Sequence, residues 1–185
     1  MVLRESGWAT PELLLIERAQ RAGDRWSGHM AFPGGFVDPG DADARAAAER
    51  ETREEVGLPL EPAEWLGRLD DLEGRHAGRR AGLVISAFVY YHPAPGRLVT
   101  NHEVAQALWV PLPRLATPDS RVDHCQATVQ QGRAQIYPGI LVGQPGRQVV
   151  WGLTYRFLEN FFAIVGRPLP DRWTTSPSEQ TGSPD

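Results

Sequence analysis

The chain has 185 residues, a hydrophobic fraction of 41% and a formal net charge of −4. These values predict a single domain with one core of ordinary size. The acidic balance argues against a protein that binds duplex nucleic acid, which needs a basic face to displace counterions. It does not argue against a small polyphosphate substrate, because a bound divalent cation can reverse the local sign of the field.

The chain contains one cysteine, Cys125, so no disulfide can form within it, which fits a reducing compartment. We interpret Cys125 as a small buried residue rather than a nucleophile. No apolar run approaches the length of a membrane span, and the first residues lack the apolar stretch of a secretory signal. We therefore expect a cytoplasmic protein that does not enter a membrane.

The first half of the chain predicts a strand, a loop and a helix. Four consecutive aliphatic residues within 12–16 predict a strand buried on both faces. Residues 19–29 read as a loop, and residues 30–32 as a short strand that Pro33 breaks. Residues 43–56 are rich in Ala, Arg and Glu and form the clearest helix, capped by Asp41 or Asp43 and ended by Gly57.

The second half predicts mostly strands. We expect strands at 65–72, 83–91 and 106–110, a basic loop at 73–82, and a hairpin from 125–129 and 133–137. Apolar residues recur at helical spacing over 149–165, which predicts an amphipathic helix packed on the core. We expect a domain over 1–167 and a disordered tail over 168–185. Strands outnumber helices without strict alternation, which indicates an α+β fold with a mixed sheet.

Three carboxylates share one face of the predicted helix. Glu51 lies three residues from Glu54 and four from Glu55, and both spacings make neighbours on a helix. Such like charges repel by roughly a few tenths of a kcal/mol per pair. A divalent cation such as Mg²⁺ removes that penalty, because it prefers carboxylate oxygens as ligands. Taken alone, the pattern favours a solvated face, in which Arg50 supports Glu54 at i+4.

The segment upstream of the helix favours the metal site. Gly34 and Gly35 are adjacent, so the backbone can adopt positive φ and approach a ligand closely. A strand, a glycine bend and a helix carrying three carboxylates, in this order, predict a cradle for a metal ion and a diphosphate.

These residues resemble the Nudix box, in which a glycine is followed at fixed spacing by an acid, an Arg-Glu pair, a Glu-Glu pair and a glycine. The matching positions are Gly34-Gly35, Asp41, Arg50-Glu51, Glu54-Glu55 and Gly57-Leu58. Eight residues separate Asp41 from Arg50, one more than usual, and Thr52 stands where an apolar residue is usual. The longer loop and the aspartate are similar to the branch that contains coenzyme A diphosphatases.

Weaker similarity to that branch extends over residues 13–165. It rests on Leu14-Leu15 with Arg18, Gly28, Phe32-Pro33, Asp38 and Trp151-Gly152-Leu153-Thr154. The resemblance implies an α/β/α sandwich around a mixed sheet. It also implies hydrolysis, dependent on Mg²⁺ or Mn²⁺, of a diphosphate bond in a nucleoside diphosphate linked to another group. The stretch before residue 12 leaves little room for the opening strand that this family usually has.

The resemblance also implies roles for individual residues. Glu51 and Glu55 correspond to the principal metal ligands, Glu54 to a third ligand or a base, and Gly34 to a carbonyl ligand. Arg50 would orient the glutamates by salt bridge. The base is open between Glu54 and Glu103, and a solvent-facing loop acid is the alternative reading of Glu103. We expect substrate contacts at Arg18, Arg25, Gly35, Arg75 and Arg79. An exposed basic turn is the alternative reading of Arg75 and Arg79.

Several alternatives stay open at this point. The substrate could be a coenzyme A derivative, a dinucleotide, a nucleotide sugar or an oxidised nucleotide, and a homodimer is possible. Trp26 could stack on a base or pack in the core. A second hypothesis is a Nudix-like module that senses nucleotides without catalysis. A third is a partner-binding domain whose acidic helix is merely solvated.

Overall fold

The central strand β2 (Pro11–Arg18) explains why the fold has two apolar layers. The computed structural model describes residues 1–6, 10–24, 26–76, 79–127 and 134–170. Successive side chains of a strand point to opposite faces. Leu13 and Leu15 accordingly belong to one core cluster, and Leu14 and Ile16 to the other. All four are at most 1% exposed, which confirms the predicted strand buried on both faces.

The main sheet has six strands, and β2 pairs with three of them. One edge of β2 pairs antiparallel with β8 (Val104–Pro111) over most of its length. Its other edge pairs with β1 (Val2–Glu5) at residues 11–13 and with β3 (Met30–Ala31) at residues 16 and 17. The sheet continues from β1 to β7 (Phe88–Tyr91), which runs parallel to it, and then to β4 (Glu64–Arg68), which is antiparallel to β7. The sheet is therefore mixed.

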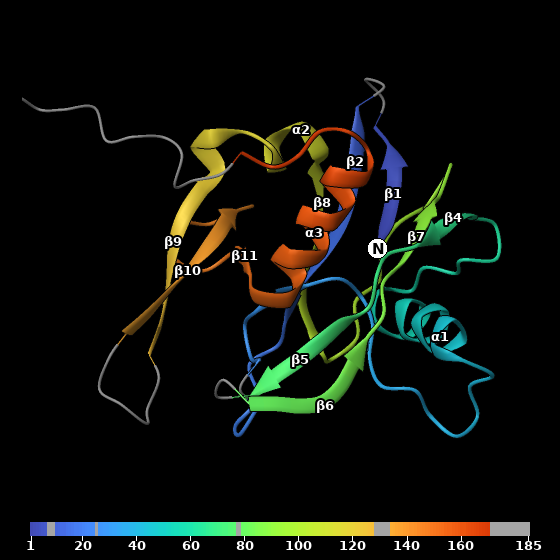
Figure 1. Cartoon of the computed structure of the whole chain (residues 1–185). Helices are drawn as coiled ribbons and strands as arrows, with labels where there is room; N and C mark the ends of the chain where they lie inside the picture. Colours follow the sequence, from blue (N-terminus) through green and yellow to red (C-terminus); the bar gives the residue numbers. More distant parts are fainter. Residues whose placement is uncertain (7–9, 25, 77–78, 128–133, 171–185) are drawn as a thin grey trace, which may run out of the picture.

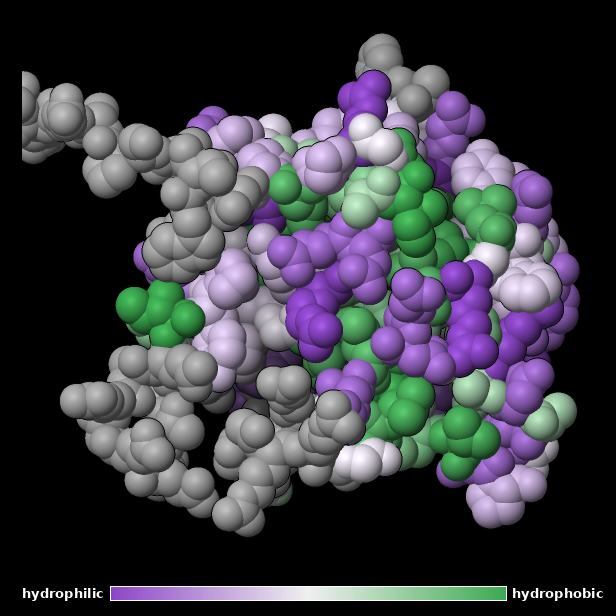
Figure 2. All heavy atoms as spheres, in the orientation of Figure 1, coloured by the Kyte–Doolittle hydropathy of each residue, from purple (hydrophilic) through white to green (hydrophobic). Residues whose placement is uncertain are grey.

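Two helices cover opposite faces of this sheet. Val56 of α1 (Ala44–Val56) packs in the cluster that holds Leu14 and Ile16. Leu158 and Phe161 of α3 (Gly152–Ile164) pack in the cluster that holds Leu13 and Leu15. Figure 1 shows α1 and α3 on different sides of the strands. The surface over α1 is largely hydrophilic (Figure 2). The fold is the α+β sandwich with a mixed sheet that the sequence predicts.

A second sheet joins the α3 side of the molecule. It consists of β9 (Arg121–Ala127), β10 (Ala134–Leu141) and β11 (Val149–Trp151), with β10 in the middle. A polar network ties the loop before β11 to the main sheet. Glu17, only 2% exposed, accepts hydrogen bonds from Arg147 Nε at 2.6 Å and Gln148 Nε2 at 2.9 Å. Gln148 Nε2 also donates to Gln106 Oε1 of β8 at 2.8 Å.

Some predicted boundaries are wrong. The sequence predicted little room for an opening strand, but the chain has one. Strand β1 is only four residues long and pairs with both β2 and β7. The strand expected at 65–72 is split, since β4 ends at Arg68 and β5 (Leu72–His76) begins a separate pair with β6 (Arg79–Ile85). The basic loop expected at 73–82 is therefore largely a hairpin.

A set of hydrogen bonds around Asp71 accompanies the break between β6 and β7. Asp71 accepts hydrogen bonds from Arg68 Nη2 at 2.6 Å and Ser86 Oγ at 2.8 Å. One continuous strand was predicted over 83–91, which includes Ser86.

The helix that was expected at 149–165 begins at Gly152, after the three residues of β11. The short helix α2 (Leu112–Leu115) and the 3₁₀ helix η1 (Pro118–Ser120) follow β8.

Two predictions fall partly on residues that are not described. Strands β9 and β10 pair antiparallel as the predicted hairpin requires, but its turn, 128–133, lies outside the described residues. Of the expected tail, 171–185 lies outside them too. Among the described helices, none is long and apolar enough to cross a membrane.

Candidate active site

The two ends of α1 are fixed by local sequence, and they determine where its carboxylates point. Asp43 caps the N-terminus by accepting a hydrogen bond from Ala46 N at 2.8 Å. Gly57 ends the helix in a left-handed conformation with φ 67°, and its N–H donates to Arg53 O. Gly57 was predicted, and Asp43 was one of the two N-cap residues that the sequence offered. Thr52 and Glu55 thereby face the sheet and are 3% and 1% exposed.

The glycine bend after β3 closes over this helix face. Gly34 has φ 155°, and its N–H donates to Glu55 Oε2 at 2.9 Å. A Cβ added at Gly35 would collide with the Glu51 carboxylate, so only glycine lets that carboxylate lie against the bend. The structure therefore brings Gly34, Gly35, Glu51 and Glu55 together as predicted.

The environment of Glu55 disfavours its charged form. Burial raises the pKa of Glu55 to about 7, although the hydrogen bond from Gly34 acts in the opposite direction. The negative charge of Glu51 raises this pKa further, and the charge of Glu103 adds a smaller rise. A buried carboxylate beside a second carboxylate fits a divalent cation, whose charge offsets both effects.

Arg50 gathers the acidic residues at the edge of the site. Its guanidinium donates to both Asp41 oxygens at 3.0 Å, to Glu51 Oε1 at 2.9 Å and to Glu54 Oε2 at 3.1 Å. The bond from Arg50 is also the largest cause of the lowered pKa of Asp41. Arg50 thus holds the glutamates by salt bridge, and its Glu54 contact is the predicted i,i+4 pair. The side chain of Glu54 is 53% exposed, whereas that of Glu51 is 16% exposed.

The loop at 101–103 lies against the same site. Asn101 N donates to Glu55 O at 3.0 Å, and Asn101 Oδ1 accepts from Glu103 N at 2.8 Å. Ala19 N donates to Glu103 O at 2.8 Å, and Arg21 Nη2 pairs with Glu103 Oε1 at 3.0 Å. Glu103 is therefore an ion-paired residue beside the site, with 35% of its side chain exposed.

Arg18 also lies at this edge. Its Nη2 pairs with Asp24 Oδ2 at 3.2 Å, and its positive charge partly offsets the rise in the pKa of Glu55 that burial causes. The Nε atom of Arg18 is buried and has no hydrogen-bond partner among the residues that the structure describes. Such a donor is suited to an anionic ligand that brings its own acceptor.

The sequence did not single out Arg21, Asp24 or Asn101. Asn101 had a usable signal, because Asn side chains commonly accept from a backbone N–H two residues ahead. The pairing of Arg21 with Glu103 depends on two loops far apart in sequence and has no such signal.

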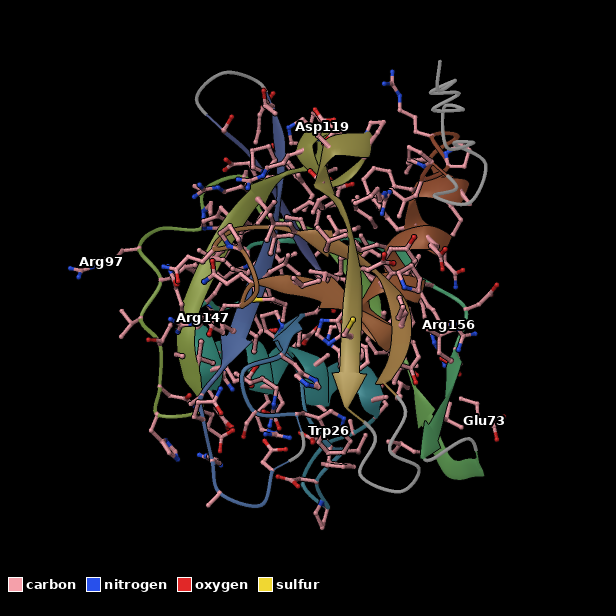
Figure 3. All side chains as sticks on the ribbon, turned by 90° about the vertical axis from the view of Figure 1, so that its left-hand side faces the viewer. Trp26, Glu73, Arg97, Asp119, Arg147 and Arg156 are labelled. Atoms are coloured by element: carbon pink, nitrogen blue, oxygen red, sulfur yellow. The ribbon has the colours of Figure 1, made fainter. Side chains whose placement is uncertain are left out.

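The structure does not fully describe three of the remaining predicted residues. Arg25 lies outside the described residues, as do the side chains of Arg75 and Arg79, whose backbones belong to β5 and β6. Trp26 is 49% exposed on its loop (Figure 3), so core packing is wrong for it. Cys125 is exposed, which corrects the prediction of a buried residue; it lies near the end of β9.

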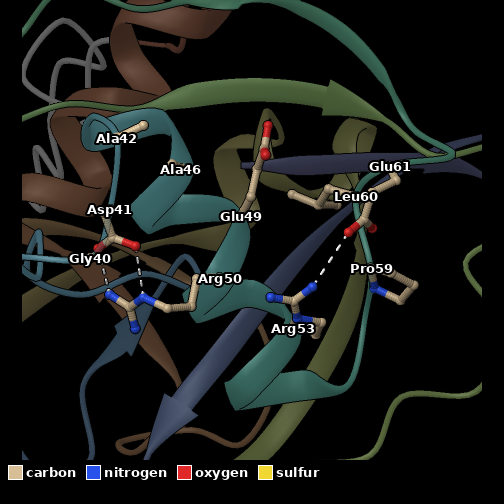
Figure 4. Close-up of a pocket in the computed structure, with 10 residues that line it drawn as sticks. All are labelled: Gly40, Asp41, Ala42, Ala46, Glu49, Arg50, Arg53, Pro59, Leu60 and Glu61. Atoms are coloured by element: carbon tan, nitrogen blue, oxygen red, sulfur yellow. Dashed lines mark hydrogen bonds and ion pairs between the residues drawn. The ribbon is translucent and has the colours of Figure 1, made fainter.

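An open hollow of about 410 Å³ lies on the other flank of α1 (Figure 4). Its lining includes Ala46, Arg50 and Arg53, which project away from Glu55 at 100° per residue. An ion pair of Arg53 with Glu61 crosses it at 3.4 Å, and both side chains are more than half exposed. We place the site under the glycine bend because the buried, electrostatically strained carboxylate lies there.

No ready-made metal cage is present in the described part of the chain, since no three Asp, Glu, His or Cys side chains are arranged there to hold a metal ion. This agrees with the way Mg²⁺ is usually held, by one or two carboxylates together with water and substrate phosphates. Glu51 and Glu55 supply two such carboxylates.

The family model described as NUDIX domain matches residues 2–128. The chain belongs to the Nudix family. The Nudix hydrolase NudL of Pectobacterium atrosepticum is 33% identical over 163 residues, which cover 86% of this chain and 78% of that protein. An uncharacterised protein of Schizosaccharomyces pombe is 40% identical over 126 residues, or 66% of this chain. That match covers only 37% of the S. pombe protein. A match to NudL of Citrobacter koseri covers 52% of that NudL protein.

Solved structures show the same Nudix fold. An Ap4A hydrolase of C. elegans in a binary complex has a TM-score of 0.50 and 24% identity, covering 60% of this chain and 76% of that one. The Nudix hydrolase RenU of M. smegmatis has a TM-score of 0.51 and 23% identity, covering 63% of this chain and 70% of that one. Members of this family use divalent metal ions.

The raised pKa of Glu55 predicts an unusual pH dependence of metal-free stability. The folded chain keeps the Glu55 proton up to pH about 7, whereas the unfolded chain loses it near the ordinary value of 4.5. This group's contribution to stability is therefore greatest below pH 4.5 and falls as pH rises to 7, by up to about 3 kcal/mol. Urea unfolding in EDTA at pH 5 and pH 8 measures it.

The variant Glu55→Gln should lack most of this pH-dependent loss and be more stable than the wild type at pH 8 without metal. Glu54→Gln, at a half-exposed position, is the matched control and should keep the wild-type pH dependence. Equal pH dependence in the wild type and Glu55→Gln would contradict the proposed environment of Glu55.

Proposed function

We propose that the chain is a pyrophosphohydrolase that cleaves a diphosphate bond in a nucleoside diphosphate-linked substrate, with Mg²⁺ or Mn²⁺ as the cofactor. The observation that carries the proposal is the buried Glu55 carboxylate, bound to Gly34 N and adjacent to Glu51. Membership of the Nudix family supports it, because the box residues of that family occupy this position.

In this proposal, Glu51, Glu55 and the carbonyl of Gly34 hold the metal ion. When bound, the ion neutralises phosphate oxygens and acidifies water. Arg50 keeps Glu51 oriented through its 2.9 Å contact and is itself anchored by Asp41. Glu54 is a candidate third ligand, and its carboxylate would have to leave Arg50 to fill that role.

We assign Glu103 as the base that accepts a proton from the attacking water. Its charge acts on Glu55, so its carboxylate lies near the proposed metal site. Its backbone is bonded to Ala19 and Asn101, and Arg21 holds its carboxylate. Glu54, the alternative base, is more exposed and already paired with Arg50.

Arg18 and Gly35 are the proposed phosphate contacts. The unpartnered Nε of Arg18 can donate to a phosphate oxygen, and a bare backbone at Gly35 lets the substrate approach. Arg25, Arg75 and Arg79 stay candidate substrate residues that only the sequence suggests.

The substrate class is proposed at two levels. A nucleotide-like diphosphate follows from the family, and the structural neighbour from C. elegans puts dinucleotides such as Ap4A among the compounds to test. The long box loop with Asp41 favours a coenzyme A derivative, and nucleotide sugars and oxidised nucleotides complete the set. We also propose a cytoplasmic location and a possible homodimer, without binding to duplex nucleic acid or membranes.

The experiment that tests this function is a substrate screen with products read by mass spectrometry. Coenzyme A, NADH, ADP-ribose, diadenosine polyphosphates and 8-oxo-dGTP are incubated with the full chain and Mg²⁺ or Mn²⁺. We expect cleavage of a diphosphate bond in at least one compound, none in EDTA, and loss of turnover in Glu55→Gln. Glu61→Gln, an exposed acid that pairs with Arg53, is the control and should keep wild-type turnover. No cleavage across the panel would favour a nucleotide-sensing module instead.

A second prediction separates the two candidate bases. Loss of a general base costs roughly 10²–10⁴ in rate. We expect Glu103→Gln to lower kcat by this amount with little change in KM, and Glu54→Gln to lower it much less. Steady-state kinetics on the best substrate measure both. A collapse of kcat in Glu54→Gln together with near-normal kcat in Glu103→Gln would reverse the assignment.

A further inference from the structure

Four aromatic side chains gather where the second sheet meets the chain just before β3. Trp151 of β11 lies at the centre of this ring cluster. Its ring centroid is 4.4 Å from that of His124, nearly parallel to it, and 5.3 Å from that of Tyr137. His29, next to the first residue of β3, meets Trp151 edge-on at 4.9 Å.

Strand pairing places three of these rings on one face of the second sheet. Tyr137 of β10 is directly opposite His124 of β9, and Gly139, two residues further along β10, is opposite Trp151. Alternate residues of a strand share a face, so these side chains lie together. Ile140 and Val150, on the other face, are fully buried in the core with α3. The ring cluster therefore faces away from α3.

The ring cluster is not part of the hydrophobic core. All four rings are only partly buried, whereas Phe157, Phe161 and Phe162 of α3 are at most 7% exposed. The cluster combines flat surfaces with polar edges, namely two imidazoles, a phenol and an indole. Such rings suit a planar ligand that stacks on a π-face and offers hydrogen-bonding groups at its own edge.

Arg18 connects the ring cluster to the proposed diphosphate site. Its backbone N–H donates to His29 O at 3.0 Å, so the two residues are neighbours across β2 and the start of β3. Only five residues of chain lead from His29 to Gly34, which limits their separation to about 17 Å. The cluster is thus within reach of a ligand whose phosphates lie at the glycine bend.

We propose that the ring cluster of His29, His124, Tyr137 and Trp151 is the subsite for the nucleobase of the substrate, with Arg18 between it and the metal site contacting phosphate. The inference rests on the proposed function, since it assigns the ring end of that substrate. Tyr137 and Trp151 lie beyond residues 2–128, so this part of the subsite lies outside the matched NUDIX domain.

Calorimetric titration of the full chain with AMP and with ribose 5-phosphate tests the proposal. The two probes share the sugar phosphate and differ in the base. Stacking of a base on an aromatic side chain is worth about 1–3 kcal/mol, so AMP should bind at least about fivefold tighter than ribose 5-phosphate. Tyr137→Leu and His124→Ala should each weaken AMP binding by about fivefold or more and leave ribose 5-phosphate binding unchanged.

Two further variants serve as controls. Trp65→Ala removes a ring that is 50% exposed on β4, where it lies over Arg45, and it should bind AMP as the wild type does. Tyr137→Phe keeps the ring, and it should retain AMP affinity even if Tyr137→Leu proves too unstable to titrate. Equal binding of the two probes, or wild-type AMP affinity in both His124→Ala and Tyr137→Leu, overturns the proposal.

A failure of the proposed subsite can be distinguished from a failure of the proposed hydrolase activity. A preference for AMP that depends on the ring cluster, without any diphosphate cleavage, would leave the subsite standing and remove the hydrolase. Cleavage of a nucleotide substrate with the same KM in the wild type and Tyr137→Leu would leave the hydrolase standing and remove the subsite.

Discussion

The contact between the N–H of Gly34 and the buried carboxylate of Glu55 is the interaction on which the rest of the site depends. A carboxylate with 1% exposure loses its hydration, and one hydrogen bond of 2.9 Å offsets only part of that cost. Glu51 adds a second negative charge nearby. An arrangement of this kind is unfavourable for stability alone, and it becomes favourable when a cation completes it.

The fold supplies this arrangement from both sides. The capped helix α1 fixes the side chains of Glu51 and Glu55 toward the sheet, and β3 delivers the glycine bend because it is paired to the far end of β2. On the other face, a hydrogen bond from Gln148 to Glu17 connects the second sheet to β2, and Glu17 directly precedes Arg18. The proposed phosphate contact therefore lies between two layers, with the box on one side and the ring cluster on the other.

The sequence predicted the elements whose signals are local. The aliphatic run of β2, the Asp43 and Gly57 caps and the glycine bend all depend on neighbouring residues, and the structure contains each of them. Asp71, between β4 and β5, contacts Arg68 and also Ser86, between β6 and β7, so one set of contacts accompanies both breaks. Such a contact between two segments leaves no periodic trace. The same applies to Arg21 with Glu103 and to the ring cluster, which assembles from three strands and a loop. Burial of Cys125 was predicted from residue type, but its place near the end of an edge strand decides its exposure.

The most direct test of the central claim is metal binding itself, measured without substrate by electron paramagnetic resonance of Mn²⁺ titrated into the full chain. The account predicts that the wild type binds Mn²⁺, that Glu51→Gln and Glu55→Gln each weaken this binding strongly, and that Glu54→Gln weakens it less. Unchanged Mn²⁺ affinity in a folded Glu55→Gln variant would show that the buried carboxylate does not hold the ion, and it would contradict the account.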